Sequence, residues 1–213
     1  MPLLRLLAAF DDALMPLRCV FCGTRTIGDE RFVCIGCARD LPAIVSSPAP
    51  GSPLAAEVAP FAFEFPVDAA IKALKFRRRL FYAPALAQLL CGACAELPPD
   101  IDAVLPVPLH WRRKWLRGFN QALEIARPVA RRLDVPVIHN VYRRRATPAQ
   151  SGLSAAKRAS NLRAAFRVRG SLPYRHVLIV DDVITTGATV RELARALIKA
   201  GPDRVSALAV ARA

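Results

Sequence analysis

The pattern of apolar and polar positions along the chain predicts short buried strands that alternate with helices. The run at residues 177–180 is too short for a helix and rich in β-branched side chains, which favours a central strand. Residues 101–108 and 205–211 form further apolar runs, and helical periodicity appears at residues 121–133 and 189–200. This alternation predicts an α/β fold with a parallel sheet and helices on both faces.

Two carboxylates and a hydroxyl-rich turn follow the strand predicted at residues 177–180. Asp181 and Asp182 are expected at the carboxyl end of that strand, where open α/β sheets bind their ligands. A loop rich in backbone amides and hydroxyls then runs into the next helix, and such a helix start suits a phosphate. The loop consists of Thr185, Thr186, Gly187, Ala188 and Thr189.

The two acids cannot serve that phosphate, because like charges repel each other. They suit the hydroxyls of an attached sugar, since carboxylates accept hydrogen bonds from a vicinal diol. The pattern therefore predicts a site for a phosphorylated ribose. The alternative is that Asp181 and Asp182 form only a turn and a helix cap. A Walker A loop is excluded because no lysine follows Gly187, and the glycines of a dinucleotide fingerprint are missing.

This segment closely resembles the 5-phosphoribosyl-1-pyrophosphate (PRPP) motif of type I phosphoribosyltransferases. The resemblance implies that Asp181 and Asp182 hold the 2- and 3-hydroxyls of the ribose. It also implies that residues 185–189 wrap the 5-phosphate. None of the three histidines has an acid–base partner in the sequence pattern, and His176 is interpreted as structural.

Two CxxC pairs near the amino terminus enclose an 11-residue loop. This spacing predicts a tetrahedral zinc site, and its role should be structural because four thiolates leave no open position for a substrate. The alternatives are free buried cysteines or, in an exported protein, disulfides. The predicted ligands are Cys19, Cys22, Cys34 and Cys37.

Composition and charge narrow the class of protein. A hydrophobic content of 54% excludes a disordered chain, and no apolar run reaches the roughly 18 residues of a membrane span. Residues 3–10 are expected to form an amphipathic helix rather than a signal peptide, which favours a cytoplasmic protein. Cys91 and Cys94 have no partner pair and are interpreted as small buried residues at a helix end rather than a redox or metal site.

The positive charge is concentrated in the middle of the chain. Residues 71–170 carry 20 Lys or Arg and five acids, whereas the whole chain has a net charge of +14. This region is where an anionic partner is expected. The basic loop at residues 109–121 is positioned for a diphosphate, the alternative being a solvated loop. The long polar segment at residues 142–166 is interpreted as a lid over the site.

Several segments occur in the order of the ComF family, over about residues 19–211. They are the CxxC pairs, LPVPLHWRRKWLRGFNQALEIAR, TPAQSGL…KRASNLRAAF and VLIVDDVITTGATV. The resemblance implies a type I phosphoribosyltransferase-like fold, an amino-terminal zinc ribbon and a link to DNA uptake. It places Lys75 in a characteristic lysine position. It implies a pyrophosphate side with Arg117, Gly118, Asn120 and Gln121, and a flexible loop with Thr147, Gln150, Arg158 and Asn161.

The expected function is a Mg²⁺-dependent phosphoribosyltransferase acting on PRPP and an acceptor that the sequence does not identify. Its catalytic residues would be Arg117, Asp181 and Asp182. The alternative is a non-catalytic protein of the transformation machinery that binds PRPP and single-stranded DNA, in contact with competence proteins. Aromatic side chains would then stack on bases or, equally, anchor the core: Phe76, Trp111, Trp115 and Phe119.

The expected domains follow from these segments. Residues 1–45 should form the helix and zinc ribbon. Residues 46–66, which are rich in serine and proline, should form a linker. Residues 67–213 should form the phosphoribosyltransferase-like domain.

Overall fold

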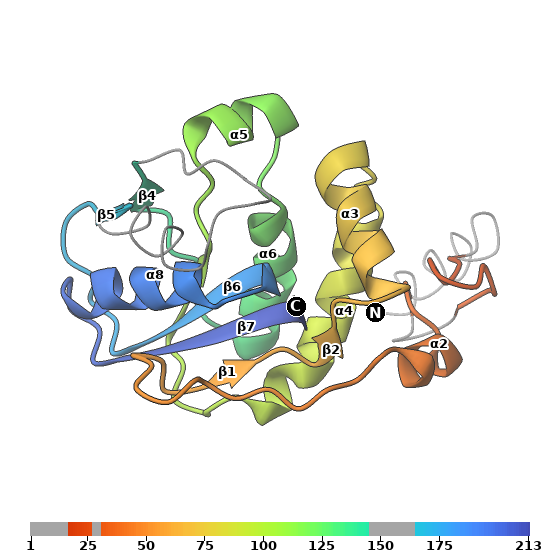
Figure 1. The fold of residues 1–213 in the computed structure, drawn as a ribbon, viewed down its shortest axis with the longest axis horizontal. Coiled ribbons are helices and arrows are strands. Elements are labelled where there is room, and N and C mark those ends of the chain that lie inside the picture. The colour runs from red at the N-terminus through yellow and green to blue at the C-terminus, as the bar shows by residue number, and fades with distance from the viewer. Residues whose placement is uncertain (1–16, 27–30, 145–164) are drawn as a thin grey trace, which may run out of the picture. The chain divides into compact units, whose positions relative to one another are not determined.

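The computed structural model describes residues 17–26, 31–144 and 165–213 (Figure 1). The chain divides into two compact units, Met1–Leu41 and Pro42–Ala213. The amphipathic helix expected at residues 3–10 lies outside the described residues. So do the four residues expected in the flexible loop: Thr147, Gln150, Arg158 and Asn161.

The larger unit is built on a five-stranded parallel sheet with the strand order β1-β7-β6-β3, in which β2 also pairs with β7. Val104 of β3 pairs with Leu178 of β6, and Leu178 pairs with Ser206 of β7. The apolar run expected as a central strand is fully buried, as in sheets covered on both faces. The strands are β1 (Glu57–Val58), β2 (Phe61–Ala62), β3 (Ala103–Pro106), β6 (His176–Ile184) and β7 (Arg204–Arg212).

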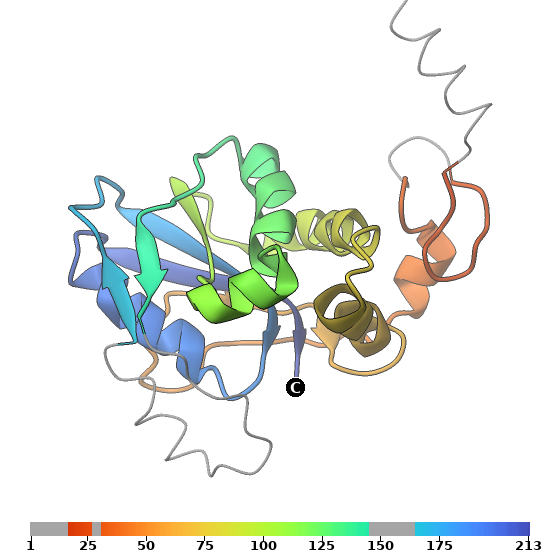
Figure 2. The same cartoon turned by 90° about the horizontal axis from the view of Figure 1, so that it is seen from above.

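Helices cover both faces of this sheet, which confirms the predicted architecture (Figures 1 and 2). One face carries α8 (Ala188–Ile198), whose Leu193 and Leu197 pack in one buried cluster with Val177 and Ile179. The other face carries α4 (Tyr82–Ala93) and α6 (Gln121–Leu133). Three further elements of this unit are α3 (Val67–Arg77), α5 (Trp111–Arg117) and the 3₁₀ turn Cys94–Glu96.

The segment expected as a linker, residues 46–66, contributes β1 and β2 to the sheet. The hydroxyl of Ser46 accepts a hydrogen bond from the backbone N–H of Ala59 at 2.6 Å, which holds the segment against itself. None of the described helices combines the length and hydrophobicity that spanning a bilayer requires.

Two regions expected to be loops contain regular structure. The basic loop after β3 contains α5, whose Trp111, Trp115 and Leu116 are 63–81% exposed. A helix without a buried stripe lacks the periodicity by which helices are predicted. The polar segment expected as a lid starts in β4 (Val141–Arg143) and ends in β5 (Phe166–Val168), which pair antiparallel.

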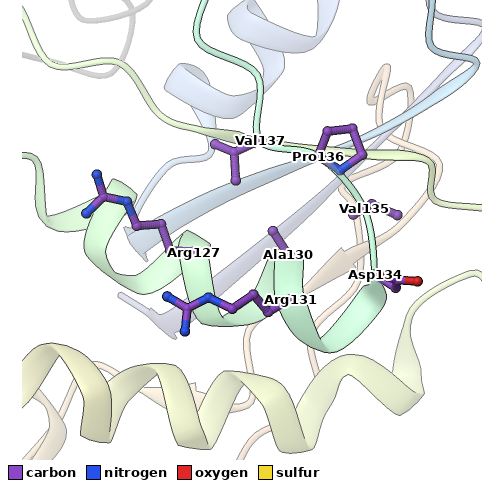
Figure 3. A pocket seen from close by; sticks show the side chains of 7 residues that line it. All are labelled: Arg127, Ala130, Arg131, Asp134, Val135, Pro136 and Val137. Atoms are coloured by element: carbon purple, nitrogen blue, oxygen red, sulfur yellow. The ribbon is translucent and has the colours of Figure 1, made fainter.

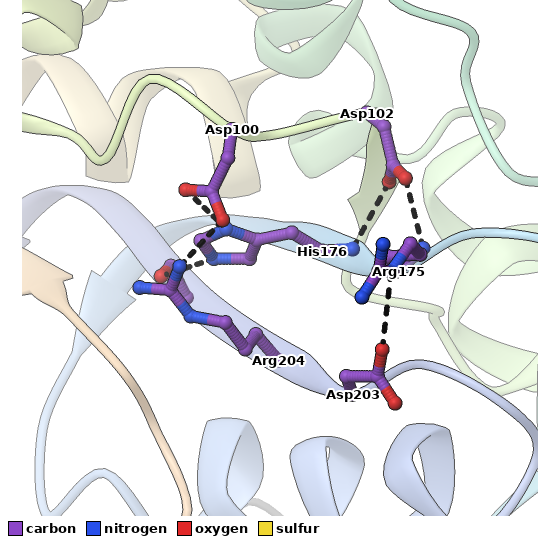
Figure 4. Close-up of polar contacts among 7 residues, drawn as sticks. Asp100, Asp102, Arg175, His176, Asp203 and Arg204 are labelled. Carbon is purple, nitrogen blue, oxygen red and sulfur yellow. Dashed lines mark hydrogen bonds and ion pairs between the residues drawn. The ribbon is translucent and has the colours of Figure 1, made fainter.

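The amino end of the sheet is held by a polar network around His176, which is 1% exposed (Figure 4). Its Nε2 lies 2.8 Å from Ser206 Oγ, and its Nδ1 lies 3.0 Å from Asp100 Oδ1. Asp102 accepts a hydrogen bond from the backbone N–H of His176 at 3.2 Å. Ser206 is fully buried, so this serine offers no nucleophile to a substrate. The network is structural, as the sequence suggested for His176.

Candidate functional site

The connections that follow β3 and β6 lead toward opposite edges of the sheet. After β3 it passes through α6 and returns at Val137, which pairs parallel with Val104 on the outer side of β3. After β6 it passes through α8 and returns as β7 on the other side. The loops at the carboxyl ends of β3 and β6 therefore diverge, and such a switch point is where doubly wound sheets form a ligand crevice.

Asp181 and Asp182 lie in the last part of β6, since the strand extends to Ile184 rather than ending at Val180. Successive strand residues point to opposite faces of a sheet. Asp181 lines a small pocket of about 30 Å³ with the loop that follows. Asp182 is 3% exposed, and its Oδ1 forms an ion pair with Lys75 Nζ of α3 at 2.9 Å. The two acids thus have different surroundings.

Burial determines how readily the carboxyl group of Asp181, next to Asp182, ionises. Burial and the adjacent Asp182 raise the pKa of Asp181 to about 8, while Lys75 acts in the opposite direction. Two neighbouring carboxylates in a low-dielectric site resist being ionised together. A ligand that brings positive charge or hydroxyl donors would relieve this repulsion.

The loop after β6 forms the remaining wall of the small pocket, with Thr185, Gly187 and Thr189 among its lining residues. Gly187 has a φ of +70° and precedes the first residue of α8. The backbone N–H of Ala188 lies 3.4 Å from the hydroxyl oxygen of Thr186. The structure therefore places the five loop residues at a helix amino terminus beside Asp181, which is a suitable place for an anion.

The basic segment after β3 approaches the acids through Arg117. This side chain is half-buried, and burial lowers its pKa while Asp182 acts to raise it. Arg117 Nη1 donates a hydrogen bond to Gln121 Oε1 at 3.0 Å. Asn120 caps α6, because its Oδ1 accepts from the backbone N–H of Ala122 at 3.1 Å. Gly118 takes a φ of +81° at the turn between α5 and α6.

Two cations near the acids were not predicted from their residue pattern. Lys75 was noted only through the family resemblance, and its partner Asp182 was not foreseen. Arg143 of β4 is the second: burial and the nearby Arg113 lower its pKa, and Asp181 acts to raise it. Arg143 belongs to a run of three arginines, and this run was the only signal available.

The four cysteines of the smaller unit come together as predicted. Their Sγ atoms all lie within 4.8 Å of one another, and Cys22 and Cys34 are separated by 3.6 Å. Sulfurs about 2.3 Å from a tetrahedral zinc ion lie about 3.8 Å apart, whereas a disulfide requires about 2.05 Å. The geometry is compatible with a zinc ribbon rather than with disulfides.

Backbone turns shape this four-cysteine cluster. Gly23 has a φ of +75° in the first knuckle, and its N–H donates to the carbonyl of Cys19 at 2.9 Å. Cys34 caps α2 (Ile35–Asp40), and its Sγ accepts from the backbone N–H of Cys37 at 3.4 Å. Hydrogen bonding with Thr24 lowers the pKa of the Cys22 thiol to about 6, whereas burial and hydrogen bonding with the neighbouring thiols raise the pKa of Cys37. The four thiols therefore have different tendencies to ionise.

Comparison with known proteins identifies the family. Residues 120–213 match the phosphoribosyl transferase domain. Competence protein F of Haemophilus influenzae is 38% identical over 160 residues, which cover 70% of this chain and 69% of that protein. The DNA utilization protein YhgH of Escherichia coli K12 is 40% identical over 156 residues, which cover 69% of this chain and 67% of that protein. The chain belongs to the ComF family.

The matched domain of this ComF-family protein contains α6, β6, α8 and β7, and so includes the acids and the loop that follows them. The expected type I phosphoribosyltransferase-like fold is confirmed. A purine phosphoribosyltransferase from Pyrococcus horikoshii Ot3 is similar over 61% of this chain and 82% of that chain, with 18% identity and a TM-score of 0.38. That likeness is too weak to bear on the site.

Two larger cavities of the ComF-family protein lie outside the acid pair. One, of about 490 Å³, lies between the second half of α6 and the chain after it, with Arg127 and Arg131 one turn apart along its wall (Figure 3). The other, of about 430 Å³, has Trp111, Tyr142 and Arg143 in its wall. Neither of these two cavities is lined by Asp181 or Asp182, whereas Asp181 lines the small pocket after β6.

Proposed function

We propose that this protein binds PRPP at the carboxyl end of β6 and transfers the phosphoribosyl group to an acceptor with release of pyrophosphate. The observation that carries the proposal is the pocket that Asp181 shares with Thr185 and residues 187–189 at the switch point of the sheet. Sequence and position point to the same ligand, because one wall donates hydrogen bonds and the other accepts them.

Each part of PRPP has a place in this proposal. The loop at residues 185–189 would hold the 5-phosphate with backbone amides and hydroxyls at the start of α8. Asp181 and Asp182 would accept hydrogen bonds from the ribose hydroxyls. Arg117 would face the diphosphate, with Gly118 allowing the turn and with Asn120 and Gln121 fixing the start of α6.

The chemistry requires no covalent nucleophile from the protein. The bond between C1 of the ribose and the diphosphate oxygen breaks, positive charge develops at C1, and the acceptor forms its bond there. Arg117 stabilises charge on the departing diphosphate, and the acids orient the ribose. Mg²⁺ bound to PRPP would supply further neutralisation of the diphosphate. Thr147, Gln150, Arg158 and Asn161 are proposed to belong to the loop that excludes water.

The four-cysteine cluster is proposed to hold a structural zinc ion through Cys19, Cys22, Cys34 and Cys37. The support is the mutual distance of the sulfurs and the two knuckle turns. A unit of this size buries too little apolar surface to be stable without such a cross-link. Four free thiols also suit a cytoplasmic location, where cysteines stay reduced.

Calorimetry with PRPP and Mg²⁺ tests the proposal, followed by measurement of pyrophosphate release with purine, pyrimidine and amine acceptors. The wild-type chain should bind PRPP, and Asp181→Asn should weaken that binding at least about tenfold, because the ribose hydroxyls would stabilise the ionised form of Asp181 and a hydrogen bond to a charged group contributes roughly 1.5–3 kcal/mol. Glu192→Gln on the next helix is a matched control. No heat with folded, zinc-loaded wild-type protein would reject the proposal.

A second candidate is a non-catalytic protein that binds PRPP and single-stranded DNA. It is favoured by the basic surplus of residues 71–170 and by Trp111 and Trp115, which are 65% and 81% exposed on the arginine-rich helix α5. The relatives' names also refer to competence and to DNA utilization. DNA affinity should fall steeply with salt if phosphate contacts drive it. Trp115→Ala should weaken it, and Asp181→Asn should leave it unchanged.

A further inference from the structure

Lys75 reaches from α3 into the acid pair. Its ammonium nitrogen lies 2.9 Å from Asp182 Oδ1, and the two side chains are 20% and 4% exposed. Lys72, one turn earlier on the same helix, instead pairs with Asp68 at the surface and is 55% exposed. The two lysines of α3 therefore differ in burial and in the acid that they pair with, although they lie only three positions apart in the sequence.

The ion pair leaves one oxygen of Asp182 for another partner. Oδ2 is buried and accepts no hydrogen bond from the described residues. A buried carboxylate needs a counter-charge and hydrogen bonds to remain ionised. Lys75 provides the counter-charge at Oδ1, whereas Oδ2 keeps its capacity to accept a hydroxyl.

The last turn of α3 also contacts the basic segment after β3. Arg78 donates a hydrogen bond to the carbonyl of Leu116 at 2.6 Å. Arg117 lies over the ring of Phe76, with 5.4 Å between the guanidinium carbon and the ring centroid. One helix turn thus contacts the acid side and the diphosphate side of the proposed site at the same time.

We propose that Lys75 is a positioning residue for the sugar: its ion pair holds Asp182 so that the second carboxylate oxygen accepts a ribose hydroxyl. This inference rests on the proposed binding of PRPP. It assigns to α3, which lies outside the matched phosphoribosyl transferase domain, a role in recognising the sugar rather than the phosphate. The phosphate loop after β6 should act independently of Lys75.

The test compares Lys75→Met with Lys72→Met by calorimetry, using PRPP, ribose 5-phosphate, 2-deoxyribose 5-phosphate and methyl phosphate. Lys75→Met should weaken the affinity for PRPP and for ribose 5-phosphate at least about tenfold, which corresponds to the loss of one charged hydrogen bond. Its preference for ribose over deoxyribose 5-phosphate should fall. Its affinity for methyl phosphate should remain within about twofold of wild type. Lys72→Met should change none of these affinities.

A double-mutant cycle separates positioning from a merely structural effect. If Lys75 acts through Asp182, Lys75→Met should cost no further PRPP affinity in an Asp182→Asn background. Additive losses, or an equal loss of methyl phosphate binding, would overturn the inference. If Lys75→Met does not fold, two other variants take its place in the test. One is Lys75→Arg, which keeps the charge, and the other combines Lys75→Met with Asp182→Asn, which removes both charges of the pair. Wild-type affinity in Lys75→Met refutes this inference alone, whereas a wild-type chain that does not bind PRPP refutes the proposed function as well.

Discussion

Gly187 and Arg191 approach so closely that a Cβ atom at position 187 would lie 2.5 Å from Arg191 Nη1. Gly187 also has a φ of +70°, and its carbonyl accepts a hydrogen bond from the backbone N–H of Arg191 at 3.0 Å. The turn between β6 and α8 thus packs against the first turn of the helix that it starts. A side chain at position 187 would disturb both the backbone and the arginine.

Gly187→Ala should therefore weaken PRPP binding. We expect at least a tenfold loss of affinity by calorimetry, and a loss of roughly 1 kcal/mol in the free energy of unfolding from the positive φ. Gly51→Ala is the matched control, because Gly51 has a φ of +71° with open space around it. That control should lose similar stability and keep its affinity. Equal PRPP affinities for the wild-type and Gly187→Ala chains would contradict the assignment of the loop.

His176→Ala should destabilise the protein without changing ligand binding. It removes the partner of fully buried Ser206 and leaves a cavity, for which we expect a loss of roughly 2–4 kcal/mol in denaturant unfolding. The side chain of Arg175 is 88% exposed, so Arg175→Ala should cost about 0.5 kcal/mol or less. A large change in PRPP affinity for folded His176→Ala would show that the amino end of the sheet matters to the site.

The raised pKa of Asp181, about 8, predicts a specific pH dependence of stability. Between pH 4 and pH 8 the folded chain holds a proton at Asp181 that the unfolded chain lacks. Its contribution to the free energy of unfolding therefore falls as the pH rises through this range, by at most about 1.4 kcal/mol per pH unit. Asp181→Asn removes this contribution, so the variant should gain stability relative to wild type from pH 5 to pH 8. If the free energies of unfolding of wild type and Asp181→Asn differed by the same amount at every pH, the raised pKa of Asp181 would be contradicted.

Chelation should affect the smaller unit selectively. We expect one zinc ion per chain by elemental analysis, and loss of hydrogen-exchange protection within residues 19–40 when a strong chelator is added. Cys34→Ser should reduce the zinc content, whereas Cys91→Ser on α4 should not. Metal-free wild-type protein with full protection in this segment would count against the zinc site.

Elements with a buried apolar stripe were predictable from the sequence. The helix expected at residues 121–133 is confirmed as α6, because its periodic apolar side chains are buried and Asn120 caps it. The end of β6 was placed too early. Its apolar run stops at Val180, but backbone pairing with β7 continues through Asp181, opposite Ala209, and does not depend on side-chain polarity.

The site was less predictable than the fold, because its geometry depends on contacts between distant segments. The acid pair and the turn at residues 185–189, which is proposed to hold the phosphate, were selected from local sequence alone. The ion pair of Lys75 with Asp182 and the proximity of Arg143 to Asp181 join elements that only the folded sheet brings together. The helix α5 was not predicted because its tryptophans are exposed and so do not follow the apolar periodicity of a buried helix face.

The short outer strands of the sheet have a consequence for solubility. β1 and β2 each contain two residues and are separated by a segment with Pro60, which has no N–H to donate. At the other edge, Val137 forms a single bridge to Val104 directly after Pro136. Within the part of the chain that the structure describes, neither border of the sheet presents a long row of unpaired peptide groups, so another chain has few free groups with which to pair as an added strand. The architecture thereby discourages edge-to-edge aggregation.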